Sequence, residues 1–252
     1  MNDLRPSEPI TQRVKHELRR RTLTVQAVER VTPRMVRITL SGAELDNFLS
    51  AAPDDHIKLF FPGTDGKPEM RDFTPRHYDA AVGTLAIDFV LHEGGPAGSF
   101  AASAQVGDTL EIGGPRGSLI VSDRVKRWLL VGDETALPAI GRRIEELGAD
   151  AVVHAIIAVS DAQEEQSFAS RAEVHLTWVH RDPTDSANPE PVLAALRESE
   201  FVSDMFVWVG AEASVARAVR DHILNERGHP KSWMRASGYW QMGHADAHES
   251  LD

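Results

Sequence analysis

The stretch WLLVGDETALPAIGRRIEELG, residues 128–148, decides the fold predicted for this chain. Its first part, WLLVGD, is a continuous apolar run that ends in a turn, which is typical of a strand buried on both faces. Apolar residues then recur at helical spacing in Ile140, Ile144 and Leu147, which indicates a helix directly after the strand. A strand that turns straight into a helix predicts a parallel sheet with crossover helices.

The same alternation continues toward the C-terminus. Further apolar runs and helically spaced segments predict three strands and two helices: AVVHAIIAV (151–159), VHLTWVH (174–180) and MFVWVG (205–210) as strands, PVLAALRESE (191–200) and ASVARAVRDHILNERG (213–228) as helices. We therefore predict an α/β domain over residues 125–243. A polar tail follows over residues 244–252, and we expect it to be frayed.

The pattern toward the N-terminus is one of short strands separated by turns. Runs rich in Val, Ile, Leu and Thr lie between clusters of Gly, Pro and Asp: TLTVQAVERV (22–31), RMVRITL (34–40), IKLFF (57–61), TLAIDFVLH (84–92) and DTLEIGG (108–114). About six strands at this spacing predict a small closed antiparallel β-barrel over residues 21–124. Residues 1–20 are polar and of mixed charge, and we expect a mobile tail there.

Composition excludes several classes of function. The chain of 252 residues contains no cysteine, which excludes a disulfide framework, a thiolate zinc site and a cysteine-ligated iron–sulfur cluster. Its formal net charge of -11 argues against nucleic acid as a partner, because binding to phosphate backbones needs an excess of Lys and Arg. Without an apolar stretch of bilayer length or a secretory signal, we expect a cytoplasmic protein with no membrane insertion. The histidines show no ligand pattern, and we predict no metal site.

Three segments carry residues suited to nucleotide binding. RDFTPR (71–76) offers a guanidinium for a pyrophosphate, with an aromatic ring and a hydroxyl for a flavin. In DFVLHEGGPAGSFA (88–101), a strand runs into a Gly-rich turn whose free amides form an anion site. GDETALPAI (132–140) lies at a strand end where ligands bind in open α/β sheets, with Thr135 as a candidate helix cap. Taken alone, each segment is explained more simply as a surface turn, a hairpin loop or a capped helix.

Taken together and in this order, the segments resemble the siderophore-interacting protein family, the FAD-dependent ferric-siderophore reductases of bacteria. The resemblance covers residues 23–243 and rests on these stretches: IKLFFP (57–62), RDFTPRHYD (71–79), DFVLH and GPAGSFA (88–101), GDTLEIGGPRGS (107–118), GDETALPAIGR (132–142), VWVGAE (207–212) and SGYW (237–240). It implies a ferredoxin-reductase-like fold, in which an N-terminal FAD-binding β-barrel precedes an α/β domain that binds NADPH or NADH.

The resemblance also implies which residues bind the cofactors. Phe73 stands where the family usually has Tyr, so ring stacking is kept and the hydroxyl is lost. The residues implied to bind FAD are Arg71, Asp72, Phe73, Thr74, Asp88, His92, Ala97, Gly98, Ser99 and Thr135. Those implied near the nicotinamide nucleotide are Asp133, Glu134, Ala136, Gly210 and Glu212.

For the substrate, the resemblance implies a cluster of basic side chains that attracts an anionic ferric chelate. Lys58 and Arg116 match two such positions. Where many family members carry a basic residue after YW, this chain has Gln241, and Arg235 or Lys231 is the candidate replacement. This departure argues against a strongly anionic siderophore such as a triscatecholate.

The implied activity is reduction of FAD by NAD(P)H, followed by electron transfer to Fe(III) in a siderophore and release of Fe(II). The cofactor carries this chemistry, so we assign no catalytic side chain. Two alternatives remain: a general NAD(P)H:flavin oxidoreductase that supplies electrons to a protein partner, and a non-catalytic siderophore-binding module without flavin. The choice between NADH and NADPH and the identity of the siderophore stay open, and we expect a monomer.

Overall fold

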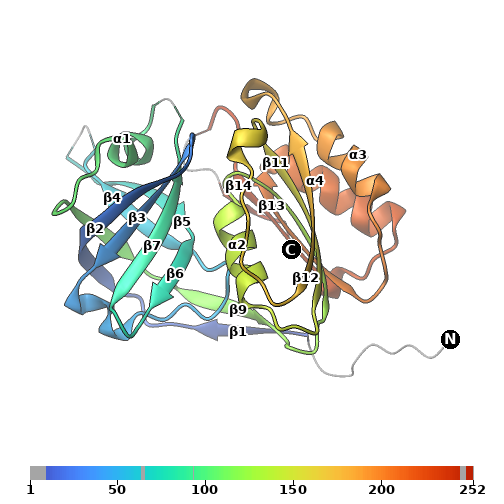
Figure 1. The fold of residues 1–252 in the computed structure, drawn as a ribbon, viewed down its shortest axis with the longest axis horizontal. Helices are drawn as coiled ribbons and strands as arrows, with labels where there is room; N and C mark the ends of the chain where they lie inside the picture. Colours follow the sequence, from blue (N-terminus) through green and yellow to red (C-terminus); the bar gives the residue numbers. More distant parts are fainter. Residues whose placement is uncertain (1–9, 64–65, 93, 245–247, 252) are drawn as a thin grey trace.

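The computed structural model describes residues 10–63, 66–92, 94–244 and 248–251. Two main sheets lie side by side, with helix α2 (Leu137–Glu146) packed between them (Figure 1). The first sheet is antiparallel and comes from the N-terminal half of the chain, and the second is mostly parallel and comes from the C-terminal half. This is the predicted fold class.

The first sheet has seven strands in the order β5-β4-β8-β2-β3-β7-β6. Their bounds are β2 Arg20–Thr32, β3 Met35–Ser41, β4 Ile57–Phe61, β5 Glu69–Phe73, β6 Pro75–Asp79, β7 Thr84–Val90 and β8 Thr109–Gly113. A short 3-10 turn, Ala43–Asn47, follows β3, and helix α1 (Pro96–Ser103) covers one end of the sheet (Figure 1). Alternate residues of the strands point inward and form one apolar core.

The sheet is curled but not closed, so the prediction of a closed barrel is wrong in this respect. Its edge strands, β5 and β6, form no ladder with each other in the described part of the chain. Only Thr74 separates them in sequence, which leaves no room for a hairpin, and Pro75 at the start of β6 has no amide proton to donate. The sequence RDFTPRHYD thus belongs to two strands that meet at Thr74, so the simpler explanation of RDFTPR as a surface turn is wrong.

The second sheet has the order β12-β11-β10-β13-β14-β15, in which β15 is Glu249–Ser250, and all neighbours from β12 to β14 are parallel. Its strands and helices are β10 Arg127–Asp133, β11 Val152–Val159, β12 Glu173–His180, β13 Met205–Glu212, β14 Met234–Trp240, α3 Glu190–Glu198 and α4 Ala213–Asp221, the last continuing as a π-turn, His222–Glu226. Short 3-10 turns occupy Ala162–Glu164, Pro183–Asp185 and Lys231–Trp233. The predicted strands and helices are confirmed, and β14 is an addition.

Apolar side chains of the second sheet alternate between two cores. Trp128 and Leu130 pack on the side of α2, whereas Leu129 and Val131 pack on the side of α3 and α4. Both faces of β10 are therefore buried, which explains why WLLVGD is apolar without a break. The central strands end together at one edge of the sheet, facing the curled sheet.

Helix α2 fastens the second sheet to the first. The Arg76 guanidinium on β6 donates to both carboxylate oxygens of Glu145 on α2, at 2.6 Å each. Arg142 on α2 donates to the backbone carbonyls of Pro75 and Ser50 at 3.2 and 2.8 Å. Because both guanidinium-bearing side chains are buried, these charge-assisted bonds fix the position of one sheet relative to the other.

Both ends of the chain are more ordered than predicted. β1 (Thr11–Lys15) pairs with β9 (Gly117–Val121), and Ile10 is buried in the core beside α2, so the expected mobile tail is wrong from residue 10 onward. Residues 1–9 lie outside the described part of the chain. β15 (Glu249–Ser250) pairs with β14 and Leu251 bonds to Ala236, so the expected fraying is wrong for residues 248–251.

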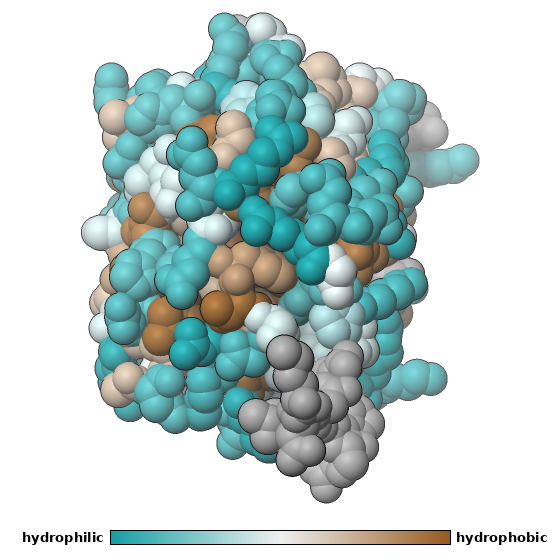
Figure 2. All heavy atoms as spheres, turned by 90° about the vertical axis from the view of Figure 1, so that its right-hand side faces the viewer, coloured by the Kyte–Doolittle hydropathy of each residue, from teal (hydrophilic) through white to brown (hydrophobic). Residues whose placement is uncertain are grey.

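The face seen in Figure 2 is mostly hydrophilic, and its apolar residues are scattered among polar ones. Within the described ranges, none of the helices combines the length and the apolar character that a membrane crossing requires.

Candidate functional site

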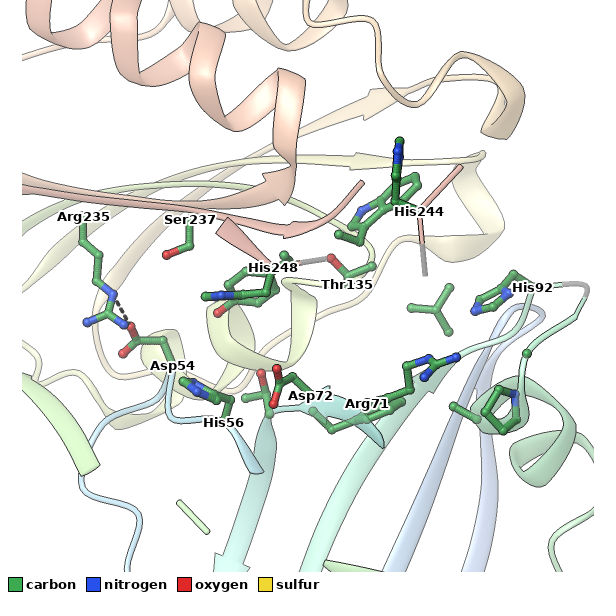
Figure 3. Close-up of a pocket in the computed structure, with 18 residues that line it drawn as sticks. Asp54, His56, Arg71, Asp72, His92, Thr135, Arg235, Ser237, His244 and His248 are labelled. Atoms are coloured by element: carbon green, nitrogen blue, oxygen red, sulfur yellow. Dashed lines mark ion pairs between the residues drawn. The ribbon is translucent and has the colours of Figure 1, made fainter. Parts of the chain in front are cut away.

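A cleft of about 220 Å³, open to solvent, lies between the curled sheet and the second sheet (Figure 3). Three elements form it: β5 with the loop before β4, the N-terminus of α1, and the carboxyl ends of β10 and β14. Its lining residues are Asp54, His56, Arg71, Asp72, Phe73, Thr74, Val90, His92, Gly95, Pro96, Ala97, Thr135, Arg235, Ser237, Tyr239, Trp240, His244 and His248.

One end of the cleft is an anion site at the start of α1. Gly94 and Gly95 have φ values of 82° and 81°, a conformation that favours glycine. The Ser99 amide bonds to the Gly95 carbonyl, so the earlier amides of Ala97 and Gly98 have no acceptor within the helix. Among the described residues, no side chain caps this helix, and no acidic residue lies in its first turn. Gly95, Pro96 and Ala97 line the cleft, so the positive end of the helix dipole lies at this end of it.

Strand β5 contributes a cation and a ring to the middle of the cleft, and Thr74, directly after it, contributes a hydroxyl. Arg71 bonds to Glu69 at 3.0 Å and to the Met70 carbonyl at 2.8 Å, and it remains part-exposed. The Phe73 ring packs on Phe89 with centroids 4.5 Å apart. This second ring fixes the orientation of Phe73, which makes its free face a rigid platform.

Across the cleft from β5 stand the aromatic residues of β14. Burial raises the pKa of the Tyr239 phenol, against the smaller effect of a hydrogen bond with Thr74. Tyr239 is therefore protonated throughout the physiological range. The neighbouring Trp240 indole donates to Asp133 at 2.9 Å, which holds its ring against the edge of the second sheet.

Asp72 carries an unused hydrogen-bond acceptor in the cleft wall. Its Oδ2 accepts from the Lys58 ammonium at 2.7 Å. Its Oδ1 is buried and has no hydrogen-bond partner within the described part of the chain. Because a buried carboxylate oxygen without a partner is costly, this atom marks a place where a ligand donor fits.

The end of the cleft farthest from α1 holds an ion pair and two imidazoles. The Arg235 guanidinium lies 3.0 Å from the Asp54 carboxylate, which also accepts from the Trp208 indole at 3.2 Å. The His56 and His248 rings lie beside this pair with centroids 5.9 Å apart. His248 comes from the segment next to β15, so the C-terminal end of the chain completes this part of the cleft (Figure 3).

Asp133 joins the carboxyl ends of β10, β13 and β14. One carboxylate oxygen accepts from the amide and hydroxyl of Thr135 at 2.9 and 2.6 Å, and the other accepts from the Glu212 amide at 2.8 Å and from Trp240. Thr135 therefore bonds to Asp133 and does not cap α2, whose N-cap is Ala136 without a side-chain bond. The network holds the strand ends in place beside the cleft.

Glu134 lies next to this network in a buried ion pair. Its carboxylate accepts from Arg181 at 2.8 Å, and the Arg181 side chain is 4% exposed. Burial, reinforced by the Asp133 carboxylate, raises the pKa of Glu134 to about 7 despite the attraction of Arg181. Glu134 is therefore divided between its charged and neutral forms near neutral pH.

The cleft brings together eight of the predicted site residues from both halves of the chain. These are Arg71, Asp72, Phe73, Thr74, His92, Ala97, Thr135 and Arg235. Ten others do not line it: Lys58, Asp88, Gly98, Ser99, Arg116, Asp133, Glu134, Ala136, Gly210 and Glu212.

Several residues outside the lining have structural partners instead. The buried Asp88 carboxylate accepts two bonds from Arg37, at 2.6 and 2.8 Å. Glu212 caps α4 through the amides of Ser214 and Val215. A Cβ at Gly210 would lie 2.6 Å from the Trp208 ring, so packing between aromatic rings already requires glycine there.

At the far end of the cleft the sequence interpretation named Arg235 but missed the residues around it. Asp54 and His56 stand directly before β4, and the signal was a polar trio, DDH (54–56), in front of a buried strand. His244 and His248 fall in residues 244–252, for which the sequence predicts only a frayed polar tail. Tyr239 and Trp240 belong to the stretch SGYW, for which the sequence predicted no role in the site.

The arrangement fits a dinucleotide with a flat ring system. The N-terminus of α1 and the guanidinium of Arg71 suit a pyrophosphate, and the Phe73 ring, which lines the cleft, suits stacking with a flat ring. The unpartnered oxygen of Asp72 suits a polar edge of the ligand. Within the described residues, no group of three or more potential ligands is arranged to hold a metal ion.

Comparisons with known proteins agree with this geometry. Residues 125–243 match the family model described as siderophore-interacting protein, and residues 24–69 and 62–119 match the siderophore-interacting FAD-binding domain. The NADPH-dependent ferric-chelate reductase of Escherichia coli is 36% identical, over 91% of this chain and 96% of that protein. The ferric vibriobactin reductase of Vibrio cholerae is 28% identical, over 88% and 92% of the two chains.

Solved structures show the same fold. A siderophore utilization protein from T. fusca superposes with a TM-score of 0.87 at 37% identity, over 94% of this chain and 98% of that one. The siderophore-interacting protein of Aeromonas hydrophila gives 0.79 at 29% identity, over 90% and 94%. The ferredoxin reductase of carbazole 1,9a-dioxygenase gives 0.66 at 17% identity, over 86% and 68%, which shows a likeness of fold alone.

Proposed function

The chain belongs to the siderophore-interacting protein family, and from this premise we propose that it is an NAD(P)H-dependent, FAD-mediated reductase that releases Fe(II) from ferric siderophores in the cytoplasm. The observation that carries the proposal is the cleft itself. A pyrophosphate site, a ring platform and the carboxyl ends of a parallel sheet all open into the same space. A nucleotide held at the sheet edge thus reaches a ring held by the curled sheet.

FAD, when bound, supplies the link between a two-electron donor and the single-electron reduction of Fe(III). The residues of the chain would bind the cofactor and orient it in the cleft. With FAD bound, the amides of Ala97 and Gly98 and the side chain of Arg71 would hold the diphosphate, and Phe73 and Thr74 would position the ring. Thr135, which is fixed by Asp133, would contact the ring from the second sheet. One-electron reduction of Fe(III) needs no proton from a side chain. The side chains of the cleft are therefore expected to bind the ligands and not to take part in the reaction.

The carboxyl ends of β10 and β13 would hold the nicotinamide nucleotide, as expected for an open α/β sheet. Thr135, just after β10, lines the cleft at this edge. The network around Asp133 keeps the edge rigid. A nucleotide bound there would supply a hydride to a ring bound on the curled sheet of the same chain.

The proposal is tested by following NAD(P)H oxidation and Fe(II) release together. Purified protein with FAD is mixed with a ferric hydroxamate, NADH or NADPH, and a chromogenic ferrous chelator in excess. We expect two Fe(II) trapped for each nucleotide oxidised, because the donor gives two electrons and each iron accepts one.

The same assay separates the alternatives. Rapid reduction of dyes with every ferric chelate left oxidised would favour a general flavin oxidoreductase. Protein that stays colourless after incubation with excess FAD, yet binds the chelate, would favour a non-catalytic binding module. Either result would overturn the proposed function.

A further inference from the structure

A further pocket of about 220 Å³, which we call the Arg21 pocket, opens beside the link from β1 to β2. The end of the 3-10 turn after β3 and the link from β8 to β9 complete it. The ionisable side chains that line it are His16, Glu17, Arg19 and Arg21. None of its lining residues also lines the cleft, so it is a separate site. Its volume is many times what one water molecule needs, which leaves room for a small ligand.

Arg21 is a buried cation that has no carboxylate partner. It is 4% exposed, and its guanidinium donates to the backbone carbonyls of Glu44, Gly114 and Asn47 at 2.8, 3.1 and 3.2 Å. A fourth carbonyl, that of Arg19, lies at 3.5 Å. Within the described part of the chain the guanidinium forms no ion pair. Carbonyl groups satisfy hydrogen bonds but have no net charge, so the positive charge of Arg21 is not neutralised.

The surroundings of Arg21 favour the binding of an anion. Burial, followed by the positive charge of Arg19, lowers the pKa of Arg21, and the largest opposing effect, that of the Glu44 carboxylate, is smaller. Both of the main causes penalise the charged form of the guanidinium. A negative charge placed in the pocket would oppose both of them.

Arg19 brings a second guanidinium to the pocket. It bonds to the Glu17 carboxylate at 2.6 and 3.1 Å, but the two side chains are 46% and 73% exposed. Water screens exposed ion pairs, which therefore contribute little free energy. Arg19 can thus turn from Glu17 to a ligand at a small cost. The planar guanidinium suits two parallel bonds to a phosphate or carboxylate group.

His16 offers one ring nitrogen to a ligand. Its Nε2 lies 2.7 Å from Ser118 Oγ, and the Ser118 hydroxyl donates to Asp55 at 2.7 Å. Because a hydroxyl has a single proton, Nε2 of His16 is the donor to Ser118, and Nδ1 remains as an acceptor. An acceptor beside two guanidinium groups matches an anion that also carries a hydroxyl group.

We propose that the Arg21 pocket binds a small oxyanion that carries a hydroxyl group, either hydrogenphosphate or a hydroxycarboxylate such as citrate. The anion accepts from Arg19 and neutralises Arg21, and its hydroxyl donates to Nδ1 of His16. The net charge of the chain is -11, which repels anions from most of the surface, so two guanidinium groups in one pocket make this place distinctive. The site lies outside the cleft and does not depend on the proposed function.

Calorimetry on the FAD-loaded protein tests the proposal, since bound FAD keeps small anions from the site at α1. The protein is titrated in a phosphate-free buffer of about 0.15 M ionic strength with inorganic phosphate, citrate and sulfate. We expect phosphate or citrate to bind with a Kd below about 1 mM. Sulfate, which has no hydroxyl at neutral pH, should bind at least about tenfold more weakly than the better of the two. Whichever of phosphate and citrate binds more tightly identifies the class of the ligand.

Three variants locate the binding. Arg19→Gln should raise the Kd at least about tenfold, because a charge-assisted contact is lost. Glu17→Gln should lower it about threefold, because Arg19 no longer has a competing carboxylate. Arg20→Gln is the matched control, since it removes the same charge from an exposed side chain that pairs with Glu111 and does not line the pocket. Its Kd should stay within about twofold of wild type. Arg21 is left unchanged, because its loss would leave buried carbonyls without a donor.

Several results would overturn the proposal. One is that neither phosphate nor citrate binds at concentrations up to about 10 mM. Another is that sulfate binds as tightly as both. A third is that Arg19→Gln leaves the Kd unchanged, or raises it no more than Arg20→Gln does, because the anion would then bind elsewhere or respond only to net charge. These titrations contain no NAD(P)H and no iron, so a failure of the proposed reductase activity would leave their outcome unaffected.

Discussion

The ion pair between Arg76 and Glu145 should couple the two halves of the molecule in a measurable way. The guanidinium is 8% exposed and the carboxylate 32%, and two bonds of 2.6 Å join them. A hydrogen bond to a charged group contributes about 1.5–3 kcal/mol. Because Glu145 keeps contact with water, we take the lower part of this range for the pair and expect a coupling free energy of about 2 kcal/mol.

A double-mutant cycle measures this coupling. Arg76→Met should cost about 3 kcal/mol of unfolding free energy, since it also removes the attraction to Asp88, while Glu145→Gln should cost about 2. The double variant should then cost about 2 kcal/mol less than the sum. Urea unfolding followed by tryptophan fluorescence gives all four values, because both Trp128 and Trp208 lie in the second sheet.

The pair Arg197 and Glu190 is the matched control. It has the same distance of 2.6 Å, but both side chains are about half exposed or more, at 47% and 63%. Exposed pairs are screened by water, so its cycle should show no resolvable coupling. We expect the coupling free energy to depend on burial of the ion pair at α2 and not on its distance alone. Equal coupling free energies in the two cycles would refute this.

Three further predictions concern single positions near the cleft. Asp133→Asn should destabilise the protein by about 3 kcal/mol in urea, because an amide NH₂ would face donors that now share a carboxylate; a loss under about 0.5 would contradict the network. Gly95→Ala should weaken FAD binding, measured by flavin fluorescence, because φ is 81° there, whereas Gly83→Ala, at a φ of 70° on a distant turn, should change stability only. Glu134 has its pKa raised in the folded state, so its contribution is favourable below its unfolded pKa and is lost as pH rises toward about 7; relative to Glu134→Gln, wild type should lose up to about 3 kcal/mol between pH 5 and 8, and a gain would show that Arg181 dominates.

The strands and helices could be predicted where burial imposes a clear period. WLLVGD is apolar throughout because helices cover both faces of β10, and the helical spacing of Ile140 and Ile144 reflects one buried face of α2. β14 was missed because MRASGYW has neither pattern. Its middle residues are small, and Gly238 lies so close to α4 that a Cβ would touch Ala213 at 3.0 Å.

The candidate site could be predicted only in its local parts. Arg71 to Thr74 form one short segment, so their grouping is visible in the sequence. The pairing of Arg235 with Asp54, or of His248 with His56, joins residues far apart in the chain. Such contacts depend on how the two sheets pack against each other. The spacing of apolar residues along the chain carries no information about that packing.

Strand β1 has a practical consequence for anyone who wishes to produce the two halves of this chain separately. Ile10 enters the core beside α2, although its strand pairs with β9 at the end of the first half. A fragment that begins at residue 125 would expose the apolar socket that Ile10 fills, and a protein trimmed to residue 20 would do the same. A purification tag at the N-terminus therefore belongs ahead of residue 10, with Ile10 and β1 retained.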